Sequence, residues 1–375
     1  MKLKRLIASL ICIALLLIII AGCSSNNTEC TFPDCGPDSP THLNVNASLA
    51  AFPHDTVMIK SGDVTLTWAE LFIFLFSTVQ DLIGSYGEDI PWNDEFDGFV
   101  LSDLLLEYST ADALTLLAYK YGLSSAGFTL SDEALLEFKH ELDSYIEEMD
   151  GLEAFVEFLR EYNGVYSLEV FENFIKLDYT IGAFADHLYG ADGAGYPDDK
   201  VAEYAEIIGY DLLMATHILR LKTEDGDDTP LKEAEEILRR LRPQASSANF
   251  LEIFQAEMFE HSEDVGGVTS FPDGYLFLYD AMVPEFSEAT MTLRLGEMSG
   301  IVETEYGYHI ILRLPVNFDS YLMTPGNVSQ LTLRQLAAGS NLEYTISEWS
   351  AFIEQNLEYT SAYNSIDLSK IFKIH

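Results

Sequence analysis

The sequence predicts an α+β fold: a small antiparallel sheet surrounded by helices, inserted in or following an all-α domain that a C-terminal helix completes. Three observations indicate this class. Apolar residues recur at helical spacing through residues 98–189, short β-rich runs begin after residue 209, and helix-forming sequence returns after Pro315. We expect the returning segment to pack on the helical N-terminal block, because its apolar face must be buried.

The first 22 residues have the pattern of a bacterial secretory signal. Basic side chains at positions 2, 4 and 5 precede an apolar run over residues 6–20, and small residues then lead into Cys23. This ending resembles the lipobox that the bacterial lipoprotein signal peptidase recognises. We therefore expect lipidation at Cys23 and a lipid-anchored chain on the extracytoplasmic face of a bacterial cell membrane. An uncleaved N-terminal anchor helix is the alternative, and it needs no cysteine at this position.

The charge of the chain excludes one class of partner. Removal of residues 1–22 leaves 17 Lys and Arg against 61 Asp and Glu, a net charge of −44. Such a chain repels the phosphates of nucleic acid. Anionic lipid head groups are repelled for the same reason, so we expect the N-terminal lipid to hold the protein at the membrane.

The chain divides into five predicted segments. These are a lipoprotein signal peptide (1–22), a flexible tether (23–50), a helical N-terminal domain (51–209), a central β-containing domain (210–315) and a C-terminal helical segment that packs on the N-terminal domain (316–375). Cys30 and Cys35 lie in the tether, which is rich in Asn, Ser, Pro and Asp, so a local disulfide stays open and a metal site is not supported. The sequence indicates no oligomeric state.

Local signals define the helical part of the chain. Residues 57–66 predict a β-hairpin that turns at Gly62, and Thr67 with Glu70 have the spacing of a capping box that opens a helix. Thr345 and Glu348 have the same spacing and predict the start of the C-terminal helix. Further helices are predicted at 98–121, 131–148, 151–162, 167–189 and 198–209.

Five short motifs follow one another in the central domain. They are His217-Ile218-Leu219, Ser262-Glu263-Asp264, a helix start from Met282 to Phe286, Gly296-Glu297-Met298-Ser299, and Gly307-Tyr308-His309-Ile310-Ile311. Each is weak alone, but the ordered set is similar to the parvulin family of peptidyl-prolyl cis-trans isomerases. The lipobox and the helical blocks on both sides resemble PrsA-like foldase lipoproteins and, more loosely, SurA-type periplasmic chaperones. The resemblance implies a parvulin-type sheet and prolyl isomerase activity.

The resemblance also implies a catalytic group of four residues. His217 and His309 would be paired core histidines beneath a cleft, and Thr304 would bond one of them. Asp264 stands where parvulins carry either a cysteine or an aspartate. Two alternatives stay open, because buried histidines are often purely structural and Asp264 could simply begin a turn.

Four apolar residues would line the pocket for the proline ring of the substrate: Met282, Phe286, Val268 and Phe271. Ordinary core packing is the alternative for the first two. The reaction needs no covalent step and no cofactor, because the obstacle is rotation about an amide with a barrier of about 18–20 kcal/mol. An apolar pocket desolvates the planar amide, and nearby hydrogen-bonding groups favour its twisted form.

Two loops depart from the family pattern. The loop between Asp264 and Gly266 is short, and Gly267-Val268-Thr269 stands in place of Gly-Asp-Leu-Gly. The loop 224–228 is acidic, so recognition of phosphorylated substrates is not expected, because phosphate binding needs basic residues. The acidic loop also lacks the spacing of an EF-hand, which favours a solvated turn over a Ca²⁺ site.

Together these features predict an extracytoplasmic, membrane-anchored foldase. It would isomerise X-Pro bonds in unfolded or partly folded exported proteins while the helical domain holds them. The alternative is a holdase of parvulin fold in which the altered loop has cost the activity. A lipoprotein that binds solute or scaffolds the envelope would leave the ordered motifs unexplained.

Overall fold

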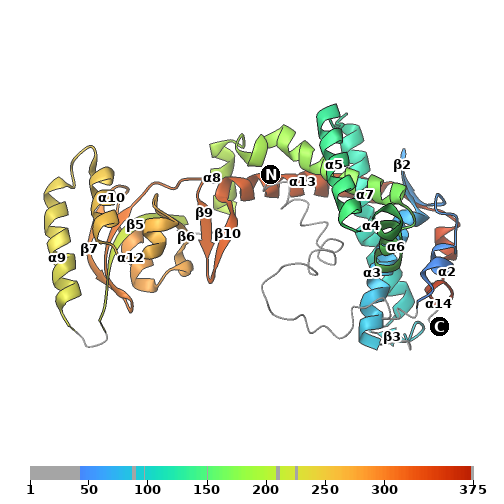
Figure 1. Cartoon of the computed structure of the whole chain (residues 1–375), viewed down its shortest axis with the longest axis horizontal. Coiled ribbons are helices and arrows are strands. Elements are labelled where there is room, and N and C mark those ends of the chain that lie inside the picture. Colours follow the sequence, from blue (N-terminus) through green and yellow to red (C-terminus); the bar gives the residue numbers. More distant parts are fainter. Residues whose placement is uncertain are drawn as a thin grey trace. The chain divides into compact units, whose positions relative to one another are not determined.

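The computed structural model describes residues 43–86, 90–96, 98–149, 151–207, 212–223 and 227–372. Cys23, the signal and the two tether cysteines therefore lie outside the described residues, as does most of the acidic loop 224–228. The chain forms two compact units (Figure 1). The helical unit comprises the described residues up to Asp192 and from Asn341 on, and the sheet unit comprises Gly193–Ser340. None of the described helices is both long and apolar enough to span a membrane.

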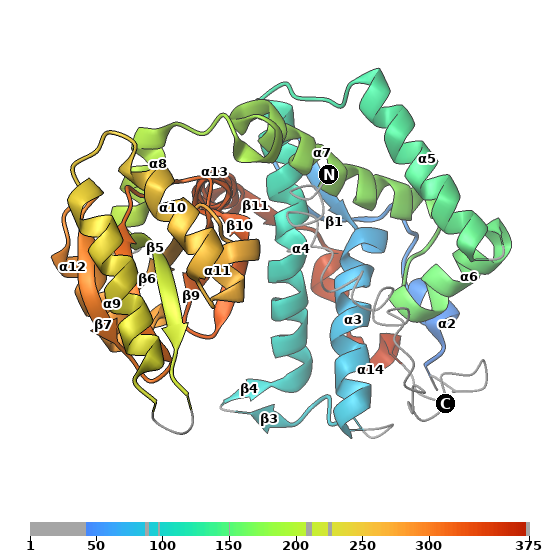
Figure 2. The same cartoon turned by 60° about the vertical axis from the view of Figure 1, so that its left-hand side comes forward.

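The helical unit is built from two separate parts of the chain. Its helices are α2 (Val45–Leu49), α3 (Trp68–Tyr86), α4 (Leu101–Ser125), α5 (Asp132–Glu148), α6 (Leu152–Asn163), α7 (Leu168–Tyr189), α14 (Leu368–Ile371) and the second half of α13 (Leu333–Gln355). A three-stranded antiparallel sheet has the order β11-β1-β2, from β1 (Val57–Ser61), β2 (Val64–Thr67) and β11 (Leu357–Tyr359), and β3 (Glu95–Phe96) pairs with β4 (Phe99–Val100). Figure 2 shows α3 and α4 lying side by side.

Local sequence signals set the start of this unit as predicted. β1 and β2 form the expected hairpin, and Gly62 adopts a positive φ of 56° at its turn. The capping box is also confirmed. The Thr67 backbone N–H donates to Glu70 Oε2 at 2.9 Å, and the Glu70 N–H donates to Thr67 Oγ1 at 3.4 Å. Helix α3 therefore begins at Trp68.

The C-terminal segment completes the core of the helical unit. Ile353 and Phe372 are each 1% exposed and lie in the same apolar cluster as Trp68 and Phe72. The Phe372 ring stacks on Phe72 with ring centroids 5.5 Å apart. Burial of these large side chains is the main stabilising contribution that this segment makes.

The prediction of helix directly after Pro315 is wrong. Residues 321–324 and 327–332 form strands β9 (Tyr321–Thr324) and β10 (Asn327–Thr332), and α13 begins only at Leu333. A capping box is present, but it is formed by Thr332 and Gln335, whose backbone N–H groups bond each other's side chains at 2.8 and 3.3 Å. Thr345 lies inside α13 and donates its hydroxyl to the Asn341 carbonyl instead, a role open to threonine within helices.

The sheet unit contains a six-stranded sheet in the order β10-β9-β6-β5-β8-β7. The four remaining strands are β5 (Leu212–Leu221), β6 (Tyr275–Leu278), β7 (Met298–Glu303) and β8 (Gly307–Arg313). All neighbouring pairs are antiparallel except β6 and β9, which run parallel. The helices are α8 (Asp198–Ile207), α9 (Thr229–Leu241), α10 (Phe250–His261), α11 (Val265–Thr269) and α12 (Pro284–Thr292).

Side-chain alternation along β5 places helices on opposite faces of the sheet. Thr216 donates its hydroxyl to the Met258 sulfur on α10, whereas Ala215 packs in a cluster with Phe286 on α12. Residues one apart on a strand point to opposite faces. The predicted α+β class, with helices around a small and mostly antiparallel sheet, is thus confirmed (Figure 2).

Candidate functional site

Two central strands bring the predicted histidines together. β5 and β8 pair so that Leu219 lies opposite His309, and His217 lies two residues along the same face. The Nδ1 atoms of His217 and His309 are 2.9 Å apart, and the two rings stack with an interplanar angle of 13°. Both side chains are buried, with 7% and 4% of their surface exposed.

Asp264 meets this pair from the loop that follows α10. Its Oδ2 lies 2.6 Å from His217 Nε2. The same carboxylate caps α11, because Oδ1 accepts the Gly266 N–H and Oδ2 accepts the Gly267 N–H, each at 3.1 Å. The short loop that departs from the family pattern therefore forms a helix start that orients the carboxylate.

Thr304 closes the other end of the network. Its Oγ1 lies 2.8 Å from His309 Nε2. The backbone N–H groups of Tyr306 and Gly307 donate to the same oxygen at 3.2 and 3.4 Å. Since these bonds occupy its lone pairs, the hydroxyl has its proton left for the His309 ring.

Tyr275 is the member of the network that the sequence did not reveal. It begins β6, is 7% exposed, and donates its hydroxyl to Asp264 Oδ2 at 2.7 Å. None of the five sequence motifs described above contains this residue. The one available signal was alternation, since Tyr275 and Phe277 share a face of a short apolar strand.

The hydrogen bonds of the network run in a single direction. An ionised Asp264 can only accept, so His217 Nε2 donates to it. When the His217 ring carries one proton, its Nδ1 accepts from His309 Nδ1–H, and His309 Nε2 accepts from the Thr304 hydroxyl. With one N–H on each ring, every bond in the chain has one donor and one acceptor.

Three members of the network have shifted pKa values. Burial alone would raise the pKa of Asp264, but the bonds from His217 and Tyr275 outweigh it and hold that pKa at about 2. Burial, and next the adjacent His217, lower the pKa of His309 to about 3. Burial and then the bond to Asp264 raise the pKa of Tyr275. At neutral pH the centre thus contains one carboxylate, a neutral His309 and a protonated phenol.

An apolar cluster lies directly against the two rings. Phe286 is 3% exposed and meets His217 edge-on at 5.1 Å and His309 at 5.6 Å between ring centroids. Met282 and Phe271 are partly buried and pack on the same cluster. Val268 is half-buried on α11 and is not among the described side chains packed there. The structure thus brings together seven of the eight residues predicted for this site.

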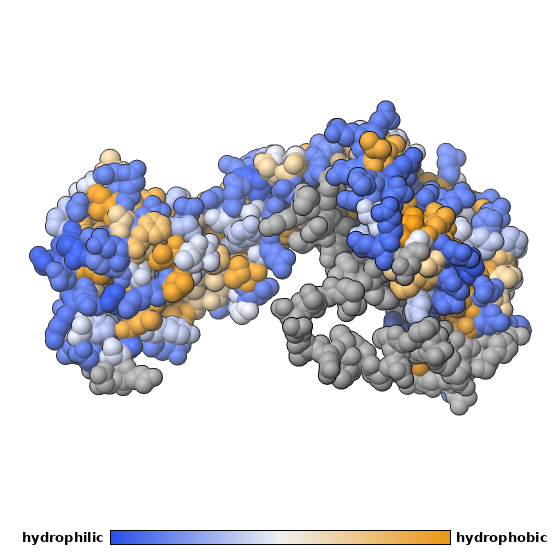
Figure 3. All heavy atoms as spheres, in the orientation of Figure 1, coloured by the Kyte–Doolittle hydropathy of each residue, from blue (hydrophilic) through white to orange (hydrophobic). Residues whose placement is uncertain are grey.

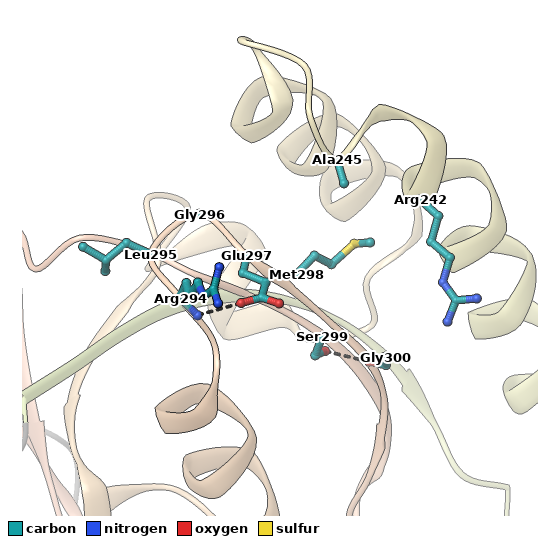
Figure 4. A pocket seen from close by; sticks show the side chains of 9 residues that line it. All are labelled: Arg242, Ala245, Arg294, Leu295, Gly296, Glu297, Met298, Ser299 and Gly300. Carbon is teal, nitrogen blue, oxygen red and sulfur yellow. Dashed lines mark hydrogen bonds between the residues drawn. The ribbon is translucent and has the colours of Figure 1, made fainter.

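A separate surface cavity of about 520 Å³ lies between the end of α9 and the start of β7 (Figure 4). Its lining includes Arg242, Arg294 and residues 295–300. None of the network residues takes part in it, and its arginines are exposed. Among the residues that the structure describes, no cluster of three His, Cys, Asp or Glu side chains could hold a metal ion. The buried network is therefore the candidate site.

Comparison with known proteins identifies the region. Residues 217–314 match the family described as "Rotamase: PPIC-type PPIASE domain". The chain is 28% identical over 274 residues to a "Foldase protein PrsA" of Caldanaerobacter subterraneus, covering 72% of this chain and 76% of that protein. A second "Foldase protein PrsA", from Halalkalibacterium halodurans, is 27% identical over 245 residues, or 62% and 66% of the two chains. The predicted parvulin resemblance and isomerase class are thereby confirmed.

Solved structures of the same name are also similar. PrsA from Bacillus subtilis has 18% sequence identity and a TM-score of 0.26, with 72% of this chain and 92% of that chain covered. PrsA from Streptococcus pneumoniae has 15% identity and a TM-score of 0.24, with coverages of 74% and 98%.

Proposed function

We propose that this chain, a PrsA-like peptidyl-prolyl cis-trans isomerase of the parvulin type, acts outside the cytoplasm as a membrane-anchored foldase. Its clients are unfolded or partly folded exported proteins that contain X-Pro bonds. The lipid at Cys23 holds it to the membrane. The foldase names of its relatives support client proteins as its partners.

The observation that carries this proposal is the continuous buried network beside an apolar cluster. Rotation of an X-Pro amide requires a twisted, less conjugated state, and each ~1.4 kcal/mol removed from the barrier gives tenfold in rate. Phe286, Met282 and Phe271 supply the apolar surface that grips a proline ring. In this proposal Val268, on the neighbouring short helix α11, lies at the edge of the surface that binds the proline ring.

The network has a positioning task in this mechanism. Asp264 already accepts four donors from the protein, and both nitrogens of each histidine are engaged. The Thr304 hydroxyl does lie beside a base, the His309 ring, but Thr304 is only 2% exposed, and rotation about an amide needs no nucleophile. His217, Asp264, Thr304 and His309 therefore fix a rigid, polarised floor beneath the twisting amide.

The direct test is a protease-coupled isomerisation assay on the chain from residue 43, using peptides that vary the residue before proline. Asp264→Ala leaves His217 without its acceptor, so we expect kcat/KM to fall about 100-fold. Asp273→Ala is the matched control, because Asp273 is an exposed carboxylate in the following loop. Equal rates for Asp264→Ala and the control would contradict the assigned centre.

A second candidate function, client holding without catalysis, is favoured by exposed aromatic side chains on the helical unit. Phe99 on β4 and Tyr108 on α4 are 58% and 65% exposed. Figure 3 shows hydrophobic side chains lying between hydrophilic ones on the surface of this unit. If the folded chain accelerates no X-Pro peptide yet prevents aggregation of a denatured protein, holding becomes the primary function. Loss of that protection in a Phe99→Ser, Tyr108→Ser variant would locate the client surface.

The anchor has its own test. In a bacterial host, Cys23→Ser should abolish labelling with a radioactive fatty acid and release the protein from the membrane fraction. Cys30→Ser is the control, because it removes a tether thiol and leaves the lipid site intact. Continued membrane association and unchanged labelling of the Cys23→Ser variant would refute lipid anchoring at this residue.

A further inference from the structure

We propose that Tyr275 is a positioning residue of the isomerase centre, whose phenol fixes the Asp264 carboxylate and thereby sets the direction of the hydrogen bonds through His217 and His309. This inference rests on the proposed site. It assigns to Tyr275 a role that no sequence motif indicates.

The Tyr275 side chain is fixed by one hydrogen bond and two ring contacts. Its hydroxyl donates to Asp264 Oδ2 at 2.7 Å. The ring is held between Phe271, with centroids 4.9 Å apart, and His217, which it meets at 5.8 Å and 75°. The backbone of Tyr275 lies opposite Ala215 on β5, two residues from His217. The strand that carries the histidine thus also anchors the phenol.

The local backbone is shaped to admit this hydroxyl. A Cβ added at Gly266 would lie 2.8 Å from the Tyr275 hydroxyl, and one added at Gly267 would lie 3.4 Å from it. The first distance, 2.8 Å, is shorter than the contacts that Cβ atoms make in proteins, so a side chain at Gly266 would displace the hydroxyl. The glycines at 266 and 267 therefore leave room for the tyrosine hydroxyl that donates to the Asp264 carboxylate.

The phenol has a specific effect on the network. Asp264 Oδ2 accepts from His217 Nε2, the Gly267 N–H and Tyr275, while Oδ1 accepts the Gly266 N–H. Each donor favours the ionised carboxylate. A protonated Asp264 would instead donate to His217 Nε2, which would reverse the direction of every bond as far as Thr304. Tyr275 therefore biases the chain toward the direction that leaves the Thr304 hydroxyl donating to His309.

Tyr275→Phe removes the hydroxyl and keeps the ring. Tyr279→Phe is the matched control, because Tyr279 is a neighbouring tyrosine that is 37% exposed. The ring nitrogens of the histidines are observed by ¹⁵N NMR in the chain from residue 43, and its kcat/KM is measured as a function of pH. We expect Tyr275→Phe to change the His217 and His309 nitrogen shifts, lower kcat/KM about tenfold with little change in KM, and move the acid limb of the profile to higher pH.

A variant that keeps the hydroxyl guards against misfolding. Incorporation of 3-fluorotyrosine at position 275 retains ring and donor but makes the phenol more acidic, so it should shift the histidine signals in the direction opposite to Tyr275→Phe. Unchanged nitrogen shifts and an unchanged acid limb in both variants would overturn the proposal and leave Tyr275 a core residue. If the wild-type chain shows no isomerase activity, the proposed function fails, yet the NMR result still decides the role of Tyr275.

Discussion

The Asp264 carboxylate is enclosed so closely that the adjacent backbone has no room for side chains. A Cβ at Gly267 would lie 2.6 Å from Asp264 Oδ2. We expect Gly267→Ala to displace the carboxylate from His217, to lower kcat/KM about tenfold and to destabilise the chain by roughly 1–3 kcal/mol. The isomerase assay and urea unfolding measure the two effects.

Gly300→Ala is the control for this substitution. A Cβ there would meet no heavy atom within 4 Å, although Gly300 lies in the same unit on β7. We expect wild-type activity for it. Similar losses in both alanine variants would mean that the enclosure of Asp264 has no special role.

Burial of His309 makes stability depend on pH. The pKa of His309 falls from 6.5 to about 3 on folding, so the folded state favours the neutral ring. This contribution is fully present above pH 6.5 and is lost as the pH falls toward 3, because the unfolded chain then binds the proton more readily. Asp264, whose pKa falls from 3.8 to about 2, adds a further loss between those values.

We therefore expect the free energy of unfolding to drop by roughly 3–5 kcal/mol between pH 7 and pH 3 through His309 alone. His309→Gln, which cannot take up this proton, should be less stable at pH 7 and should show a shallower dependence on pH. Urea unfolding at a series of pH values measures the difference. Parallel curves for the wild type and the variant would exclude His309 as the source of the dependence, and His187→Gln on the exposed end of α7 controls for the substitution itself.

At the scale of elements, the contact between α4 and the second half of α13 depends on one glycine. A Cβ at Gly122 would lie 2.0 Å from the Trp349 ring, which also packs on Phe184 with centroids 5.7 Å apart. The indole therefore cannot retreat. We expect Gly122→Ala to destabilise the helical unit by roughly 1–3 kcal/mol, seen as a lower midpoint of thermal unfolding by circular dichroism.

Gly182→Ala, in contrast, should stabilise the helical unit. Gly182 lies within α7 of the same unit, and a Cβ there would meet nothing within 4 Å. Alanine in a helix interior is more favourable than glycine by about 1 kcal/mol. If both substitutions destabilise the unit equally, helix packing at Gly122 is not the cause.

The elements that could be predicted are those whose signals are local. The hairpin around Gly62, the capping box at Thr67 and the four helices of residues 101–189 depend on residues within a few positions of one another. β9 and β10 pair as a hairpin across the Pro325-Gly326 turn, a local signal that the prediction of helix overlooked. The place of this hairpin in the sheet could not be predicted, because β9 pairs in parallel with β6, more than 40 residues earlier in the chain.

The same limit applies to the site. The histidines and Asp264 could be placed because they belong to an ordered set of motifs. Tyr275 could not, because its partner is set by the pairing of β6 with β5 and by the cap of α11, which are properties of the folded unit. Val268 was predicted from the same stretch of sequence, but its side chain does not pack in the apolar cluster.

At the scale of the whole molecule, the two units differ in how the chain builds them. The sheet unit is one continuous stretch, Gly193–Ser340, whereas the helical unit needs the residues from Asn341 on. Those residues supply Ile353, Leu368 and Phe372, none of which is more than 2% exposed. Large buried side chains typically contribute about 2–5 kcal/mol each. The helical unit is therefore incomplete until the last part of the chain has been made.

Truncation after Ser340 tests this asymmetry. We expect the helical unit of the truncated chain to lose its cooperative unfolding transition. The free energy of unfolding of a domain is only about 5–15 kcal/mol, and the loss of three large core side chains costs a comparable amount. The sheet unit should keep the histidine nitrogen signals of the His217–His309 pair, since all members of that network lie between residues 217 and 309. Phe372→Ala in the full chain removes only one of these core side chains, so it should lower the stability of the helical unit without abolishing its fold. Simultaneous loss of the histidine signals on truncation would show that the sheet unit depends on the helical unit for its fold, and the network would then have to be regarded as a property of the whole chain.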